Sequence, residues 1–191
     1  MAGHDASRIR PSAPRVAPNE TPSEEVEDVL RSAISRDGTP LNIFRTLSHH
    51  PKMMKRFNLF GGFILNKGLV PAREREIVIL RVGWNAQAVY EFGQHTEIGL
   101  RCGLTAAEID GLAGAEHAWS ADDRLLIALA DELCDDDCVT DATYAGLAER
   151  WNEAELMELV VTAGFYRLVS GYLNTFGVQL DDGVPGWPTV G

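Results

Sequence analysis

The 191-residue sequence contains only three cysteines and has no apolar run long enough to cross a lipid bilayer. A spanning helix needs roughly 18 or more consecutive apolar residues. The first residues also lack the apolar segment of a secretory signal. An odd number of cysteines in a chain without such a signal argues against a disulfide framework. These absences argue against membrane-spanning and disulfide-stapled secreted proteins, and we expect a cytoplasmic protein.

Basic residues are scarce in the second half of the chain, where only Arg124, Arg150 and Arg167 follow Ala115. The formal net charge is −11, and the sequence has no run of lysines and arginines. Proteins that bind nucleic acids or anionic membranes carry a basic patch. We therefore expect neither nucleic acid nor membrane as a partner, although the acidic balance does not identify a substrate.

Alternation of apolar and polar residues with a period of two, which is typical of half-buried strands, is not sustained in any segment. The one short β-branched run is Ile77-Val78-Ile79, and helix-forming residues flank it. The pattern predicts an all-α protein of about eight helices. Composition suits one globular domain. We expect an extended or disordered proline-rich arm over residues 1–22, a helical domain over residues 23–180 and a loop tail over residues 181–191.

Residues that start and stop helices divide the chain into segments. Thr105 with Glu108, and Asn152 with Glu155, have the spacing of a capping box. Gly103 stands where a left-handed C-terminal cap is expected. The predicted helices cover residues 23–34, a segment 41–66 split before Pro51, 71–86, roughly 87–101, 106–112, a helix after Ser120, a helix after Thr140, and a long helix that ends near residue 176.

Within the segment Tyr90-Glu91-Phe92-Gly93-Gln94-His95, the residues Glu91 and His95 are four positions apart. On a helix this spacing places both side chains on one face, one turn apart. A carboxylate in contact with an imidazole can act as a general acid and base. The alternative is a solvated ion pair on a helix surface, which has no catalytic role.

Cysteine and metal chemistry have weaker support. Cys134 and Cys138 flank three aspartates, and neighbouring negative charge raises a thiol pKa, so these thiols are poor nucleophiles. Glu76, Glu91 and His95 form a thin ligand set for a divalent metal. No spacing supports a metal site at the remaining histidines, which are His4, His49, His50 and His117. We therefore predict no metal.

Three motifs in the central stretch, RERE-IVILRV, YEFGQH and HTEIGLRCGLTAAEI, resemble the carboxymuconolactone decarboxylase family, which includes the alkylhydroperoxidase D-like (AhpD-like) proteins. The resemblance covers Pro71 to Leu112 most clearly and extends more weakly through Glu155–Phe176. It implies an AhpD-like helical bundle that commonly assembles as a trimer or hexamer. It also implies active sites near the contacts between subunits.

The redox branch of this family carries a Glu, then twelve residues later the pattern Cys-x-x-Cys-x-x-x-His. When the pattern is aligned on His95, its Glu falls on Glu76, but its two thiol positions fall on Ala88 and Glu91. A thiol–disulfide cycle cannot run without the dithiol. Cys102 lies seven residues after His95 and cannot replace it. An alkylhydroperoxidase or peroxiredoxin-type antioxidant enzyme is therefore the least favoured alternative.

The decarboxylase branch lacks the dithiol and is thought to act without a cofactor on a carboxylated γ-lactone. This resemblance implies a cofactor-independent lyase acting on a small carboxylated lactone or enolisable acid. His95 is the predicted acid/base and Glu91 its partner. Glu76 is either a second base that pairs with His95 or a member of a salt bridge to Arg73 or Arg75. The competing hypothesis is a non-catalytic oligomeric binding protein of the same fold.

Five further residues are candidates for substrate binding. Arg81 lies in apolar sequence, so it either anchors an anion or pairs with an acid, for which Glu76 and Glu91 are candidates. If one helix continues through the region, Trp84 and Ala88 share the side of Glu91 and His95. Trp84 and Phe92 could form a pocket wall, but aromatic residues at helical spacing more often belong to a core. The full set is Arg81, Trp84, Ala88, Phe92 and Tyr90, the last pointing away and able to reach only a neighbour's site.

Overall fold

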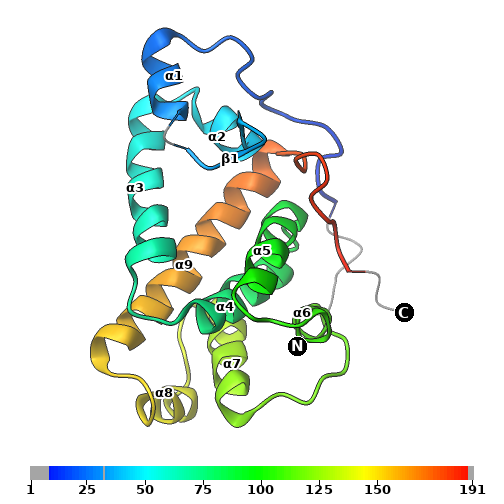
Figure 1. Ribbon diagram of the computed structural model, residues 1–191. Helices are drawn as coiled ribbons and strands as arrows, with labels where there is room; N and C mark the ends of the chain where they lie inside the picture. The colour runs from blue at the N-terminus through cyan, green and yellow to red at the C-terminus, as the bar shows by residue number, and fades with distance from the viewer. Residues whose placement is uncertain (1–8, 32, 189–191) are drawn as a thin grey trace.

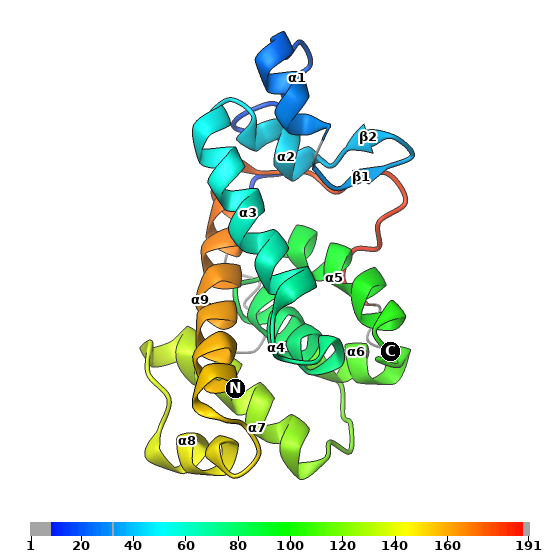
Figure 2. The ribbon, with the colours of Figure 1, turned by 60° about the vertical axis from the view of Figure 1, so that its left-hand side comes forward.

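The computed structural model describes residues 9–31 and 33–188. In this part of the chain it contains nine α-helices and one two-stranded hairpin, which confirms the all-α prediction. Figures 1 and 2 show their arrangement in space. The elements are α1 Glu24–Leu30, β1 Ser35–Arg36, β2 Thr39–Pro40, α2 Asn42–Leu47, α3 Pro51–Lys67, α4 Ala72–Asn85, α5 Val89–Arg101, α6 Ala106–Leu112, α7 Ala121–Asp136, α8 Asp141–Ala148 and α9 Glu153–Phe176.

Helix α4 is the centre of the fold, and it packs against α5, α6, α7 and α9. The run Ile77-Val78-Ile79-Leu80 is fully buried, although its side chains point to all sides of the helix. A helix that is apolar all round has to be enclosed by other elements. The β-branched run is therefore helical, as predicted, because neighbours cover every face of α4.

The predicted caps are present. Thr105 and Asn152 each form a capping box, with Glu108 and Glu155 respectively. Gly103 has a φ of 99°, in the left-handed region that favours glycine. These caps confirm the predicted starts of α6 and α9, since they satisfy the first backbone N–H groups of those helices.

The hairpin of β1 and β2 was not predicted. A helix was predicted over residues 23–34, but α1 already ends at Leu30, and Asp37 and Gly38 follow in the hairpin. Both residues have positive φ, 51° and 80°, and they form the two-residue turn of the hairpin. An Asp-Gly pair favours such a turn. Arg36 of β1 then donates two hydrogen bonds of 3.0 Å to Glu97 on α5, which fixes the hairpin to that helix.

A break separates α4 from α5, where the sequence left open one continuous helix. Gln87 has a φ of 51°, so the chain turns between Asn85 and Val89. The turn changes the direction of the chain, and residues before it no longer share a face with Glu91 and His95.

The described parts of both terminal segments run along the helical domain. In the proline-rich arm, the Arg15 amide donates to the Phe176 carbonyl at 2.8 Å, and the Asn19 amide donates to the Arg45 carbonyl at 3.1 Å. In the C-terminal tail, Asp181 accepts hydrogen bonds from the Asn42 amide and the Gln94 side chain. Both segments are therefore extended over the domain. Within residues 9–31 and 33–188, no helix combines the length and apolarity that a bilayer crossing requires.

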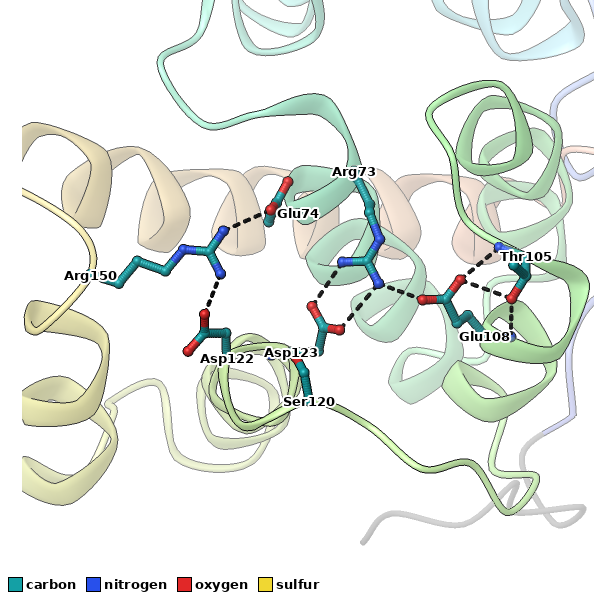
Figure 3. A network of polar contacts seen from close by, with 8 residues as sticks. All are labelled: Arg73, Glu74, Thr105, Glu108, Ser120, Asp122, Asp123 and Arg150. Carbon is teal, nitrogen blue, oxygen red and sulfur yellow. Dashed lines mark hydrogen bonds and ion pairs between the residues drawn. The ribbon is translucent and has the colours of Figure 1, made fainter.

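An ion-pair network holds the first turn of α4 against α6 and α7, as Figure 3 shows. Arg73 donates to Asp123 at 2.9 and 3.1 Å and also pairs with Glu108. Burial opposes ionisation of Asp123 and Glu108, but hydrogen bonds outweigh it, and the pKa of each carboxyl is lowered. The bonds to Asp123 come from Arg73 and Ser120, and those to Glu108 come from Thr105 and Arg73.

We predict that Asp123→Asn lowers the free energy of unfolding by about 1–3 kcal/mol, because it leaves Arg73 half-buried with one partner fewer. A carboxyl whose pKa is lowered in the folded state stabilises it above the unfolded-state pKa, and the contribution is lost as the pH falls. Stability should therefore decrease below about pH 4, and less so in the variant. Urea unfolding at several pH values measures both effects. Glu116→Gln, at an exposed position, is the control, and equal pH profiles would contradict the prediction.

Candidate active site

A cavity of about 270 Å³ lies between α3, α5 and α9, and the chain that follows α1 lines a further side. Helices α3 and α5 each contribute one face, with lining residues spaced three or four apart. Most of the wall is apolar. The lining residues are Ala33, Ile34, Leu41, Ile43, Phe44, Phe57, Asn58, Gly61, Gly62, Leu65, Asn66, Tyr90, Glu91, Gln94, His95, Ile98, Arg101, Phe165, Tyr166 and Val169.

His95 lies in the wall of this cavity with a carboxylate at each ring nitrogen. Its Nδ1 is 2.6 Å from Oε2 of Glu76, and its Nε2 is 3.0 Å from Oε1 of Glu91. The three residues are 5%, 0% and 4% exposed, respectively. The i,i+4 spacing on α5 brings Glu91 to His95, whereas the packing of α4 on α5 brings Glu76. The structure therefore joins the three residues in one chain of hydrogen bonds.

Two further residues complete the surroundings of His95. Nε and Nη2 of buried Arg75 donate to Oε1 of Glu76 at 3.2 and 3.1 Å. The ring of Tyr166 meets the imidazole edge to face, with centroids 4.9 Å apart. Glu76 therefore takes both interactions that the sequence had offered as alternatives. The charges alternate along the chain of contacts, which offsets the cost of burying them.

The hydrogen bonds at both ring nitrogens favour the imidazolium form of His95. Burial alone would lower the pKa of this histidine, but the charges and hydrogen bonds of Glu76 and Glu91 outweigh burial and raise the pKa to about 10. Since an imidazolium donates from both nitrogens, each carboxylate can accept a hydrogen bond from His95. At neutral pH the site therefore holds a protonated histidine between two carboxylates.

Glu91 is the member of this chain of contacts with a hydrogen-bonding atom to spare. Both Glu91 and His95 line the cavity, whereas Glu76 lies behind them. Among the described residues Glu91 has one hydrogen-bonding partner, His95, through Oε1. Its Oε2 is left to accept or release a proton at a ligand. His95 and Glu76 can then adjust to the change of charge.

Tyr90 was predicted to point away from this site, which is wrong. It lines the cavity, and its hydroxyl donates to Asp181 at 2.5 Å and accepts from the Ile43 amide at 3.2 Å. Burial and the Asp181 carboxylate raise the pKa of Tyr90, so the hydroxyl stays protonated. These contacts tie α2, α5 and the tail together at one end of the cavity.

Arg81 does not line the cavity. It pairs with Asp131 on α7, with Nη2 to Oδ2 at 2.9 Å, and it also donates to the Leu112 carbonyl. The ion pair that the sequence favoured is present, but its partner is Asp131 and not Glu76 or Glu91. The role of Arg81 is to join α4 to α6 and α7.

Trp84, Ala88 and Phe92 also lie outside the lining of the cavity. Trp84 and Phe92 pack against each other and against Trp187 of the tail, with ring centroids 5.2 to 6.3 Å apart. Ala88 is fully buried. The turn at Gln87 explains the error for Trp84, because it moves that residue off the face of α5 that carries His95, whereas Ala88 and Phe92 are buried in the core.

Helix α3 contributes residues that the sequence reasoning did not select, chiefly Asn58, Gly61 and Gly62. Asn58 lies among the apolar positions of α3, and a lone polar residue within such a pattern was the available signal. Arg101, the last residue of α5, was missed as well. Its distance from Glu91 along the sequence gave no reason to link the two.

Thiol and metal chemistry have no assembled site in the described part of the chain. The family's two thiol positions hold Ala88 and Glu91, and burial raises the pKa of Cys102 and of Cys134. No group of three or more His, Cys, Asp or Glu side chains there is placed to hold a metal ion.

One family model and several solved structures match this chain. The sequence model of the carboxymuconolactone decarboxylase family matches residues 51–132. A search among curated proteins finds no match.

Solved structures share the fold at low sequence identity. An uncharacterized peroxidase-related protein with an AhpD core from Ralstonia eutropha JMP134 has a TM-score of 0.75 and 19% identity, and the match covers 87% of this chain and 90% of that one. An uncharacterized peroxidase-related protein from Silicibacter sp. TM1040 gives 0.78 and 13%, covering 91% and 95%. The debrominase Bmp8, in complex with 2,3,4-tribromopyrrole, gives 0.74 and 15%, covering 87% and 91%. These neighbours establish an AhpD-like helical fold.

We predict that His95 stays protonated up to a pH of about 10 and that Glu91→Gln lowers this pKa, because one stabilising charge is removed. A histidine whose pKa is raised in the folded state stabilises it fully below the unfolded-state value of about 6.5. That contribution is lost as the pH rises through about 10. NMR titration of labelled histidine measures the pKa. Glu153→Gln, at an exposed site, is the control, and a His95 that titrates near neutrality would contradict the assignment.

Proposed function

We propose that this chain, which belongs to the carboxymuconolactone decarboxylase family through residues 51–132, is a cofactor-independent enzyme that transfers protons on a small carboxylated lactone or other enolisable acid. The observation that carries the proposal is the buried Glu76–His95–Glu91 chain of contacts in the wall of a cavity. A purely structural ion pair on a helix surface would be solvated, and this one is not.

The reaction class follows from the charges. When a β-keto or vinylogous acid loses CO₂, the carbon–carbon bond breaks and its electron pair stays on the substrate as an enolate. The enolate carbon then takes up one proton. Glu91 is placed to carry that proton: Nε2 of His95 passes it to Oε1 of Glu91 across their 3.0 Å contact, and rotation of the carboxyl group then presents it to the enolate carbon. Glu76 at Nδ1 stabilises the imidazolium and fixes the ring.

The cavity supports a small and largely apolar substrate. Its volume of about 270 Å³ lies near the lower end for ligand pockets, and apolar side chains form most of its wall. In such surroundings charges interact more strongly than in water. Peroxidase chemistry has less support, since Ala88 and Glu91 occupy the two positions where that chemistry needs thiols.

A non-catalytic binding protein of the same fold is the second candidate. The cavity would serve it equally well, but a binding protein has no need of two carboxylates buried at one histidine. Ligand binding that survives unchanged while all proton transfer is absent would favour this candidate.

We also propose a homo-oligomer, a trimer or hexamer, built on an apolar surface of α3 and α9. The two helices are in contact along this side of the molecule, as Figures 1 and 2 show. Leu59 on α3 is 77% exposed and Met157 on α9 is 68% exposed. Phe60, Phe63, Val161 and Leu168 are exposed as well. Exposed apolar side chains on two neighbouring helices are typical of an interface between subunits.

For the chemistry, we expect exchange of an acidic C–H for deuterium in a carboxylated γ-lactone, and decarboxylation where the ring allows it. His95→Gln and Glu91→Gln should each reduce the rate by about 10²–10⁴-fold, since each removes a proton-transfer group. The exchange is followed by NMR. Glu116→Gln, at an exposed position outside the lining of the cavity, is the control. Equal rates in wild type and His95→Gln would exclude the mechanism.

For the assembly, we expect Leu59→Glu to shift the protein toward the monomer, because a buried unpaired charge destabilises an interface. Light scattering coupled to size-exclusion chromatography measures the mass. Glu25→Gln, at an exposed position on α1, is a surface control. A wild-type protein that is monomeric at micromolar concentration would contradict the proposal.

A further inference from the structure

The amide of Asn58 has no hydrogen bond in the part of the chain that the structure describes. Its Oδ1 and Nδ2 are both buried and both without a partner, and the residue lines the cavity from α3. A buried polar atom without a partner costs about 1–3 kcal/mol. An unbound amide offers a ligand two N–H donors at Nδ2 and an acceptor at Oδ1. Asn58 therefore differs from Gln94, another amide of the cavity wall, which is bound to Asp181.

The surroundings of Asn58 let the amide reach a ligand. Rotation of its side chain toward the cavity breaks no hydrogen bond, since none is present. Gly62 lies one helical turn further along α3, and a Cβ added there would have no atom within 4 Å. Open space therefore lies beside Asn58 on the face that α3 turns to the cavity.

Arg101 adds a positive charge to the same cavity. Among the described residues that line it, Arg101 is the one arginine or lysine, and it forms no ion pair there. The buried arginines nearby are occupied, since Arg75 binds Glu76 and Arg81 binds Asp131. The negative charge of Glu91 repels a ligand carboxylate, whereas Arg101 attracts one. An anionic group should therefore lie toward the C-terminal end of α5.

We propose that the cavity binds a ligand with two polar groups, a carboxylate held by Arg101 and a carbonyl oxygen that accepts a hydrogen bond from Nδ2 of Asn58. This inference rests on the proposed function and specifies its substrate class. Glu91 and His95 supply the proton, but an enolate also needs a donor for its oxygen. Asn58 supplies that donor, and the bond strengthens as negative charge develops on the oxygen. Asn58 is thus assigned to carbonyl polarisation and Arg101 to carboxylate recognition.

Three probes separate the two roles. γ-Butyrolactone-γ-carboxylate carries both groups, its methyl ester lacks the charge, and tetrahydrofuran-2-carboxylate lacks the ring carbonyl. Binding is measured by titration calorimetry and by NMR shifts, with wild type, Asn58→Leu and Arg101→Gln. Arg56→Gln, on the exposed side of α3, removes the same charge outside the cavity and serves as the control.

Asn58→Leu should weaken the lactone carboxylate about tenfold and leave tetrahydrofuran-2-carboxylate unchanged. Arg101→Gln should weaken both carboxylates about two- to fivefold and leave the ester unchanged, because the arginine is exposed. Asn58→Leu should keep or raise the melting temperature, since it removes two unpaired buried atoms. A lower melting temperature would mean that the amide has a structural partner, and it would overturn the assignment.

Other outcomes also decide the matter. Equal loss of affinity for lactone and tetrahydrofuran probes, or no binding of any probe at millimolar concentration, would overturn the inference. The proposed chemistry is judged separately, by deuterium exchange in Glu91→Gln with the lactone carboxylate bound. If the lactone carboxylate binds through Asn58 but shows no exchange in wild type, the chemistry fails and the recognition stands. If wild type shows exchange and Asn58→Leu does not change its rate, the chemistry stands and the assignment of Asn58 fails.

Discussion

The histidine held between two buried carboxylates is the interaction on which the site depends. Glu76 comes from α4 and Glu91 from α5, so the imidazolium of His95 is bound only when the two helices pack at one distance. Neither carboxylate would be stable at this burial without the positive charge. The same contacts that hold the helices together therefore set the protonation state of the group that faces the cavity.

The remaining polar contacts keep α4 in place for this arrangement. Arg73 fixes its first turn to α6 and α7, and Arg81 fixes its later part to α7. The apolar run between them is enclosed on every side. The two arginines therefore hold α4 at points on either side of Glu76, which fixes the position of this carboxylate against α5.

The cavity lies between α3 and α5. Helix α9 contacts both of them, and the chain from the hairpin to α2 covers the space that remains. The contacts of Tyr90 with Asp181 and Ile43, and of Arg36 with Glu97, hold that cover in place. Burial of the Glu91–His95 pair is thus a consequence of distant segments, and the low-dielectric surroundings strengthen the interaction between the two charges.

The sequence by itself determined the all-α class, the capped ends of α6 and α9, and the approach of Glu91 to His95, because these depend on residues a few positions apart. It also selected Glu76, through the resemblance to the family. Only the tertiary structure decided that Asp131 pairs with Arg81, that Trp84 and Phe92 belong to the core, and that Asn58 and Arg101 line the cavity. One left-handed residue, Gln87, changes the direction of the chain between α4 and α5, and helical periodicity cannot be extended across such a turn.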